Sequence, residues 1–407
     1  VGANAAVLYM RRMLPARRLV LHEWVYLSGN VLTIETAVEN ESAAEVVVTL
    51  GEIVAWGNIP TWVEGYGFIK GTGSFTGDFM ARESFGVAYA LSTAQGRITA
   101  RIPSFDLPGF YDSPQTGEVP LVVPPRSISK RRIVHLAQAT SSLGDAALKL
   151  PHFANRGLKR HTVPGSRVLP SSGLPNRQRY QVDVARCGLT GGGAPSPFAR
   201  FSAESGGEIA LPAGCFFTRL TAPGHHPSPW TQAGGPPHTN WAASLPVAVL
   251  FKWRVTETGK GLLPARVLLR GLPPTPDPDW GEDPDRGAAL NVVYSETGEG
   301  EKPIPPGKYR VTIDRGFEYT LLERDIEVGK EKVFALDAAL ERVVDTKGWI
   351  AADLHLHAAP SPDAPARLDD RVRSLAAVGV EVGVATDHNV VTDYAPTIRA
   401  MKLEKWV

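Results

Sequence analysis

The stretch Trp349-Ile-Ala-Ala-Asp-Leu-His-Leu-His357 combines the apolar content of a buried strand with polar side chains at every second position near its end. Successive side chains of a strand point to opposite faces, so Asp353, His355 and His357 are expected on one face and the apolar side chains between them on the other. Two imidazoles on one face can reach the same metal ion, and a nearby carboxylate can bind that ion or orient an imidazole. The stretch therefore predicts part of a metal site.

A second polar group follows about thirty residues later. Residues 365–378 predict an amphipathic helix, and Gly379 is the residue expected just after its end. Glu381-Val-Gly-Val-Ala385 then predicts a buried parallel strand that ends at Thr386-Asp387-His388-Asn389. A strand–helix–strand unit with polar residues at both strand ends is typical of β/α-barrel active sites. We therefore expect the histidine of the second group to converge with the two histidines of the first.

These motifs resemble the start of a PHP (polymerase and histidinol phosphatase) domain, whose first motif is H-x-H and whose second ends in T-D-H. Within that superfamily the chain is most similar to the bacterial CehA/McbA-type metallohydrolases, which place β-sandwich modules ahead of the catalytic barrel. The resemblance implies two or three divalent ions (zinc, manganese or iron) with His355, His357 and His388 among the ligands. It also implies that metal-activated water attacks a small phosphoester, or a carboxyl or carbamate ester.

Four further residues near these motifs have expected roles. Asp363 lies where some family members place another metal ligand, but Ser-Pro-Asp stands here where many relatives have Ser-Asp-Gly. Asp363 could therefore bind metal or cap the following helix. We expect Asp353 and Asp387 to orient the histidines, with Asn389 beside them. The sequence identifies no catalytic acid or base.

The resemblance covers only residues 346–407, and the glutamate, the further histidines and the final D-x-H of a complete PHP domain are not found there. We therefore expect an incomplete domain and a chain that is inactive by itself as a hydrolase. The alternative is an extracellular binding or adhesion protein, in which β-sandwich modules recognise a partner and the barrel is degenerate.

Residues 1–150 predict a β-sandwich domain, because short strands alternate with turn residues and no strong helical pattern occurs. Arg131–Leu136 is expected to be its closing strand. Its aromatic side chains either fill the core or stack on a carbohydrate; they are Trp56, Trp62, Tyr66, Phe68 and Phe75. Residues 151–180, rich in Pro, Arg and Gly, predict a basic linker or a surface loop.

An internal repeat relates Glu208–Leu220 to Glu301–Ile313, an offset of 93 residues (301 minus 208). Each copy predicts a strand, a Pro-Gly turn and an alternating strand. We expect one immunoglobulin-like module at 181–245 and a second at 246–345. The turns resemble those of carboxypeptidase-regulatory-like modules in secreted bacterial proteins, which implies a periplasmic, secreted or lipoprotein location, although no signal is visible.

Composition excludes some partners. The 407 residues carry 43 basic and 42 acidic side chains, which gives no reason to expect nucleic acid. No run of 18 apolar residues occurs, so no transmembrane segment is expected. The two cysteines, Cys187 and Cys215, either form one disulfide or are buried thiols.

Overall fold

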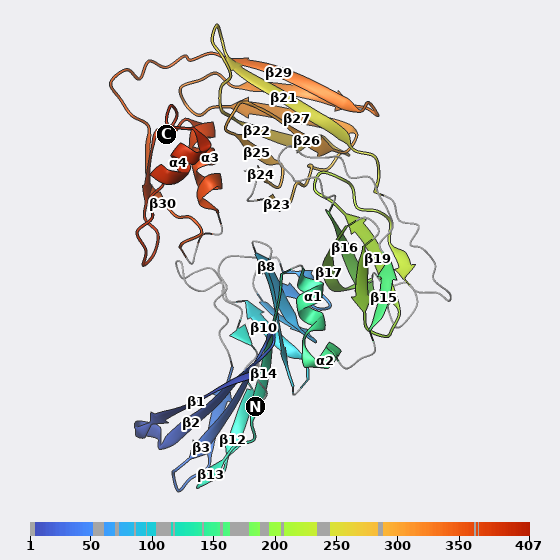
Figure 1. Cartoon of the computed structure of the whole chain (residues 1–407), viewed down its shortest axis with the longest axis vertical. Coiled ribbons are helices and arrows are strands. Elements are labelled where there is room, and N and C mark those ends of the chain that lie inside the picture. The colour runs from blue at the N-terminus through green and yellow to red at the C-terminus, as the bar shows by residue number, and fades with distance from the viewer. Residues whose placement is uncertain are drawn as a thin grey trace. The chain divides into compact units, whose positions relative to one another are not determined.

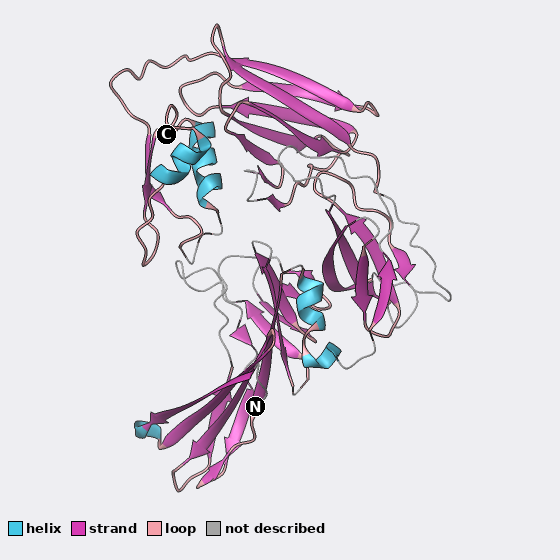
Figure 2. Ribbon diagram, viewed as in Figure 1, coloured by secondary structure: helices cyan, strands magenta, loops and turns pink. Residues whose placement is uncertain are grey.

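The computed structural model describes residues 5–51, 61–69, 73–84, 87–94, 96–102, 115–116, 119–140, 142–154, 158–162, 179–187, 195–204, 207–233, 245–283, 288–361, 364 and 366–407. These residues are mainly β, as the sequence predicts, with a few short helices (Figure 2). The chain divides into two compact units. The first contains Val1–Pro164, Gln181–Arg219 and Trp230–Ala242, and the second contains Gly165–Tyr180, Leu220–Pro229 and Ala243–Val407.

The first unit is built on a nine-stranded antiparallel sheet of order β1-β2-β3-β14-β9-β8-β5-β6, with β13 paired to β3 (Figure 1). Its strands are β1 (Ala5–Leu14), β2 (Leu19–Ser28), β3 (Val31–Asn40), β5 (Trp62–Val63), β6 (Gly67–Phe68), β8 (Met80–Ser84), β9 (Val87–Thr93), β13 (Ser127–Ile128) and β14 (Arg132–Ala139). The predicted closing strand corresponds to β14, which instead lies inside the sheet between β3 and β9. Local periodicity identifies a strand but not its neighbours, and those pairings join residues far apart in the sequence.

Smaller sheets and three short helices complete this unit. The sheets are β11-β10-β7, β12-β4, β15-β18 and β17-β16-β19-β20. Their strands are β4 (Val46–Leu50), β7 (Gly73–Gly77), β10 (Ile98–Ile102), β11 (Gln115–Thr116), β12 (Val119–Val123), β15 (Lys159–Thr162), β16 (Arg179–Arg186), β17 (Ser196–Glu204), β18 (Glu208–Leu211), β19 (Phe216–Thr221) and β20 (Thr231–Ala233). The helices are η1 (Pro15–Arg17), α1 (Leu143–Leu148) and α2 (Pro151–Ala154).

The structure differs from the linker prediction and settles part of the aromatic one. The expected linker 151–180 contains helix α2 and strand β15, which pairs with β18; residues 155–157 and 163–178 lie outside the described residues. The aromatic side chains divide between core and surface. Trp62 is buried and its Nε1 donates to the Phe198 carbonyl at 3.1 Å, whereas Tyr66 is 53% exposed. Trp56 lies outside the described residues.

Cys187 and Cys215 form a disulfide, with their Cα atoms 5.4 Å apart. The backbone N–H of Cys187 also donates to the carbonyl of Cys215 at 3.1 Å. The sequence left this pairing open, and the structure decides it in favour of the disulfide.

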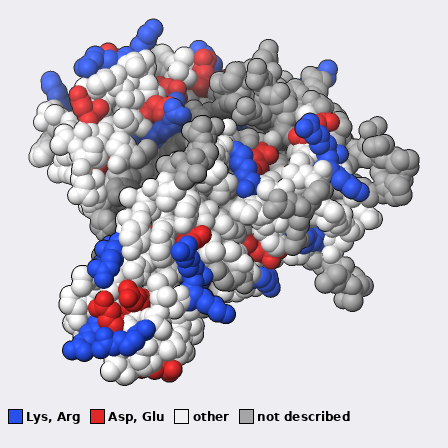
Figure 3. Space-filling model, turned by 60° about the horizontal axis from the view of Figure 1, so that its bottom comes forward, with Lys and Arg blue, Asp and Glu red and all other residues white. Residues whose placement is uncertain are grey.

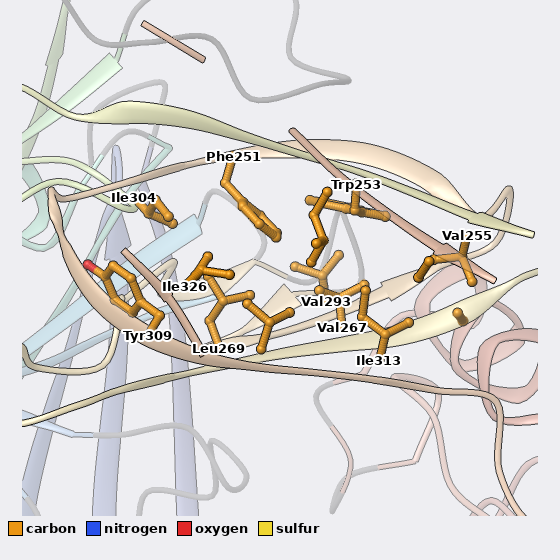
Figure 4. Close-up of a cluster of buried hydrophobic side chains, with 14 of the residues drawn as sticks. Phe251, Trp253, Val255, Val267, Leu269, Val293, Ile304, Tyr309, Ile313 and Ile326 are labelled. Carbon is orange, nitrogen blue, oxygen red and sulfur yellow. The ribbon is translucent and has the colours of Figure 1, made fainter. Parts of the chain in front are cut away.

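The second unit contains a β-sandwich of two sheets, β26-β21-β29 and β23-β24-β25-β22-β27-β28. Its strands are β21 (Val249–Glu257), β22 (Ala265–Gly271), β23 (Glu282–Asp283), β24 (Ala288–Ala289), β25 (Val292–Ser295), β26 (Glu299–Ile304), β27 (Gly307–Asp314), β28 (Leu322–Val328) and β29 (Val333–Leu340). Inward-facing side chains of both sheets share one core, which includes Phe251, Trp253, Leu269, Ile304 and Tyr309 (Figure 4). Burial raises the pKa of the Tyr309 phenol to about 12, and its hydroxyl donates to the Pro305 carbonyl at 2.8 Å.

The sequence repeat is also a structural repeat. In the first copy, β18 pairs with β15, while β19 belongs to the sheet of β16 and β20. In the second copy, β26 pairs with β21, while β27 pairs with β22 and β28. In both copies the Pro-Gly turn is therefore the corner at which the chain passes from one sheet to another.

The C-terminal segment of the second unit has the predicted strand–helix–strand order, but the prediction that its second strand is buried is wrong, because Val382 and Val384 are 41% and 39% exposed. Its elements are β30 (Ala352–Leu356), α3 (Leu368–Val378), β31 (Val382–Ala385) and α4 (Ala395–Met401), and β30 pairs with β31 in parallel. Helix α3 ends at Gly379, which has φ 76° and donates its N–H to the Leu375 carbonyl, as the sequence predicts. Figure 1 shows α3 and α4 on one side of β30, in red. Leu356, Val372, Leu375 and Tyr394 are buried between these elements.

Two arginines join this segment to the sandwich of the same unit. Arg315, only 5% exposed, donates through Nη1 to the carbonyls of Pro264 and Ala376, and its guanidinium lies 4.4 Å from the ring centre of Trp406. Arg373 on α3 donates through Nε to Glu296 of the sandwich at 3.0 Å. The segment and the sandwich are therefore packed together through buried polar contacts.

Candidate metal centre

The two histidines of the first motif face each other at the end of β30. The Nε2 atoms of His355 and His357 lie 3.0 Å apart, with ring centres separated by 5.0 Å. Two ligands of a tetrahedral zinc ion with Zn–N bonds of about 2.05 Å lie roughly 3.3 Å apart. The spacing of these two ring nitrogens is therefore close to that of two ligands of one ion.

Strict alternation fails in the middle of this strand. The β30–β31 pairing shifts register between Asp353 and Leu356, and Leu354 is 69% exposed instead of buried with Leu356. A bulge of this kind turns a side chain toward the other face. The prediction that side chains alternate strictly along this strand is therefore wrong between Asp353 and Leu356, although the two imidazoles still converge.

His388 approaches the same group from the end of β31. Its ring centre lies 4.9 Å from that of His357, edge to face. The two strand ends are fastened by Thr386, whose N–H donates to the Leu356 carbonyl at 2.8 Å. The structure therefore brings the three predicted histidines together.

The ligand set within the described residues is partial. In that part of the chain, no group of three or more His, Cys, Asp or Glu side chains is arranged to hold a metal ion. Asp363, the fourth predicted ligand, lies outside the described residues. The described residues therefore hold two imidazoles within 3.0 Å of each other and a third beside them.

The predicted orienting aspartates contact backbone groups of the first motif. Asp353 Oδ1 accepts the N–H of His355 at 3.1 Å, and Asp387 Oδ1 accepts the N–H of Ala358 at 2.7 Å. Arg371 on α3 donates both Nε and Nη2 to the carbonyl of His357, at 3.0 and 2.7 Å. Asn389 has φ 59°, the left-handed conformation that asparagine tolerates, and its side chain is exposed. Side chains therefore bind both the C=O and the N–H of the His357–Ala358 peptide group.

Asp387 has a second, unusual feature. It is only 8% exposed, and its Oδ2 atom is buried with no hydrogen-bond partner among the described residues. The buried hydroxyl of Tyr394 likewise has none there. Burial raises the pKa of Tyr394, as do the carboxylates of Asp387 and Asp353, while Arg371 opposes them. Burying a carboxylate oxygen without a hydrogen-bond partner is costly, which sets Asp387 apart from an ordinary structural aspartate.

Sequence reasoning missed three residues near this site. Arg371 and Tyr394 fit the helix and core patterns, so their sequence positions gave no sign of a polar role. The third is Ser361, which is 2% exposed. Its Oγ accepts the backbone N–H of His388 at 3.0 Å and lies 3.5 Å from Nδ1 of His357. In the Ser-Pro-Asp sequence, the pattern indicates a possible ligand at Asp363 and nothing distinguishes the serine.

On the face shown in Figure 3, basic and acidic side chains are interspersed, in keeping with a net charge of +1. No helix among the described residues is both long and apolar enough to cross a membrane.

Comparison with known proteins gives only distant likenesses. No family model and no curated protein matches the chain. Among solved structures, an α-galactosidase from Lactobacillus brevis has a TM-score of 0.29 at 10% identity, over 41% of this chain and 28% of that one. The shaft pilin SpaA from Lactobacillus rhamnosus GG has a TM-score of 0.26 at 10% identity, over 46% and 96%. A putative aldose 1-epimerase from Escherichia coli K12 has 0.24 at 12% identity, over 34% and 67%. The chain spans about a quarter of the length of the α-galactosidases it matches, with 28% and 24% covered. At these TM-scores the likenesses say nothing about function.

Proposed function

We propose that this chain belongs to a metal-dependent hydrolase that uses metal-activated water against a small phosphoester, or a carboxyl or carbamate ester. The single observation that carries the proposal is the 3.0 Å separation of the His355 and His357 Nε2 atoms, with His388 beside them at the adjacent strand end. Imidazole nitrogens suit zinc, iron and manganese, of which two or three ions would complete a PHP-type centre.

The residues of the chain have distinct parts in this proposal. His355, His357 and His388 bind the ions, and the buried Asp387 carboxylate adds negative charge beside them. The backbone contacts of Asp353, Asp387 and Arg371 hold the imidazoles in place before any ion arrives. Bound divalent ions lower the pKa of water to about 7 and polarise the P=O or C=O bond.

Metal binding by the purified chain tests the site. After incubation with zinc or manganese and dialysis, we expect bound metal in the wild type and little in the His355→Ala/His357→Ala double variant. His152→Ala, which removes a histidine of the first unit, is the control and should bind as the wild type does. Equal metal content in the double variant and the wild type would refute the assignment.

A binding or adhesion function is the second candidate. One observation favours it: no complete set of three metal ligands is assembled among the described residues. In addition, the described part of the chain consists mainly of β-strands. Metal analysis combined with a panel of phosphoester, ester and carbamate substrates separates the two functions. A protein located outside the cytoplasm suits both, and the Cys187–Cys215 disulfide supports that location.

A further inference from the structure

Ser361 follows β30 and lies between the two histidine motifs in the sequence. After β30, the N–H of Ala359 donates to the Ala366 carbonyl at 2.6 Å, and the N–H of Ser361 donates to the Ala358 carbonyl at 2.7 Å. These contacts fix the backbone on which Ser361 sits. The serine is 2% exposed, so its hydroxyl oxygen is shielded from solvent.

The hydroxyl of Ser361 connects the two motifs. Its oxygen accepts the backbone N–H of His388 at 3.0 Å and therefore has a second lone pair directed elsewhere. The Nδ1 atom of His357 lies 3.5 Å away, at the long end of the hydrogen-bond range. One oxygen atom thus touches both the histidine of the first motif and the backbone of the second.

We propose that Ser361 is a positioning residue that accepts a hydrogen bond from His357 Nδ1 and so leaves the Nε2 lone pair of His357 directed toward His355. A neutral imidazole carries one proton, and the hydrogen bond of one nitrogen decides which nitrogen remains a ligand. The same hydroxyl fixes the start of the His388 turn. This inference rests on the proposed metal-binding function, and it assigns the preparation of the site to a residue that binds no metal.

The wild-type protein gives the first test. In the metal-free chain with ¹⁵N-labelled histidine, NMR of the ring nitrogens should show the proton of His357 on Nδ1. A proton on Nε2 would overturn the proposal. This measurement needs no variant and no bound metal, so it stands even if the hydrolase function fails.

Variants give the second test, with zinc as the probe in a competition titration. We expect Ser361→Ala to bind zinc about 10–100-fold more weakly, the usual effect of losing a group that orients a metal ligand. Ser361→Thr keeps the hydroxyl and should recover most of that affinity. Ser374→Ala is the control, because the Ser374 hydroxyl only donates to the Arg371 carbonyl on α3; its affinity should equal that of the wild type.

The outcomes separate this inference from the function on which it rests. If Ser361→Ala binds zinc as the wild type does while His357→Ala does not, the role of Ser361 is refuted and the metal site stands. If His355→Ala and His357→Ala both keep full zinc binding, the metal site itself is refuted. A folded Ser361→Thr variant with the weak affinity of Ser361→Ala also counts against the hydroxyl.

Discussion

Asp183 in the first unit and Asp387 in the second are both buried aspartates, 4% and 8% exposed, but their oxygens are satisfied differently. Asp183 Oδ1 accepts from Arg200 Nε at 2.6 Å, and its Oδ2 accepts from Nε and Nη2 of Arg219 at 3.0 and 2.9 Å. Asp387 Oδ1 accepts one backbone N–H, and its Oδ2 has no partner among the described residues. Burial of a charge without a partner is costly. The saturated carboxylate therefore has the contacts of a structural residue, whereas one oxygen of Asp387 lacks such contacts among the described residues.

The strongest test of this comparison is to remove the saturated carboxylate. Asp183→Ala leaves two arginines without their shared acceptor, which should lower the free energy of unfolding by about 3 kcal/mol, near the lower limit for breaking a buried ion pair. The lower limit applies because the two arginine side chains are 24% and 32% exposed. Urea denaturation measures the change. A loss below about 1 kcal/mol would remove the contrast with Asp387.

The complementary change is Asp387→Asn. An asparagine can keep the Oδ1 contact to Ala358, so the free energy of unfolding without metal should stay within about 1 kcal/mol of the wild type. Zinc affinity should fall about 10–100-fold, because the negative charge beside the histidines is gone. Titration with zinc and urea denaturation of the same sample give both values. A large loss of stability with unchanged zinc affinity would make Asp387 a structural residue like Asp183.

A third change sharpens the account of the unpartnered oxygen. Tyr394→Phe removes a buried hydroxyl that has no partner among the described residues. Losing such a group should leave the free energy of unfolding unchanged or raise it by up to about 1 kcal/mol. A decrease of more than about 1 kcal/mol would indicate that the phenol donates to Asp387 in solution. Differential scanning calorimetry of the metal-free protein measures this.

The smallest effect is expected at a surface pair. Arg254 donates to Glu299 at 3.0 Å, but both side chains are about half exposed, at 58% and 49%. Arg254→Ala should therefore change the free energy of unfolding by less than about 1 kcal/mol. Urea denaturation of Arg254→Ala and Asp183→Ala under the same conditions compares the two losses of unfolding free energy. Similar losses would mean that burial does not determine how much an ion pair stabilises this protein.

The sequence predicts those parts of the structure that depend on local pattern. The helix from Leu368 to Val378 and its end at Gly379 match the expected periodicity and end signals. The parallel strand that follows is in the predicted place, but the prediction that it is buried is wrong, because Val382 and Val384 are 41% and 39% exposed. The Pro-Gly corners of the two repeats also match, because the turn residues occur in both copies. Such features depend only on residues that are close together in the sequence.

Other parts depend on contacts that no local pattern contains. The pairing of Lys159 with Leu211 turns part of an expected linker into a strand, and the register shift after Asp353 exposes Leu354. At the candidate site, the histidines are visible because imidazoles at alternate positions are rare. Ser361 is not, because a serine before a proline is ordinary, and only the folded loop brings its hydroxyl to His357 and His388.

Arg315 has a practical consequence for anyone who divides the gene. Its guanidinium reaches from the sandwich to the Ala376 carbonyl and to the ring of Trp406. Cutting the chain near residue 345 would expose the Ala376 carbonyl and the Trp406 ring to water in one fragment. In the other fragment, the Arg315 guanidinium would lose both contacts. The smallest portion worth expressing therefore begins before the sandwich, at Ala243. The histidine-bearing segment then folds against the sandwich that supports it.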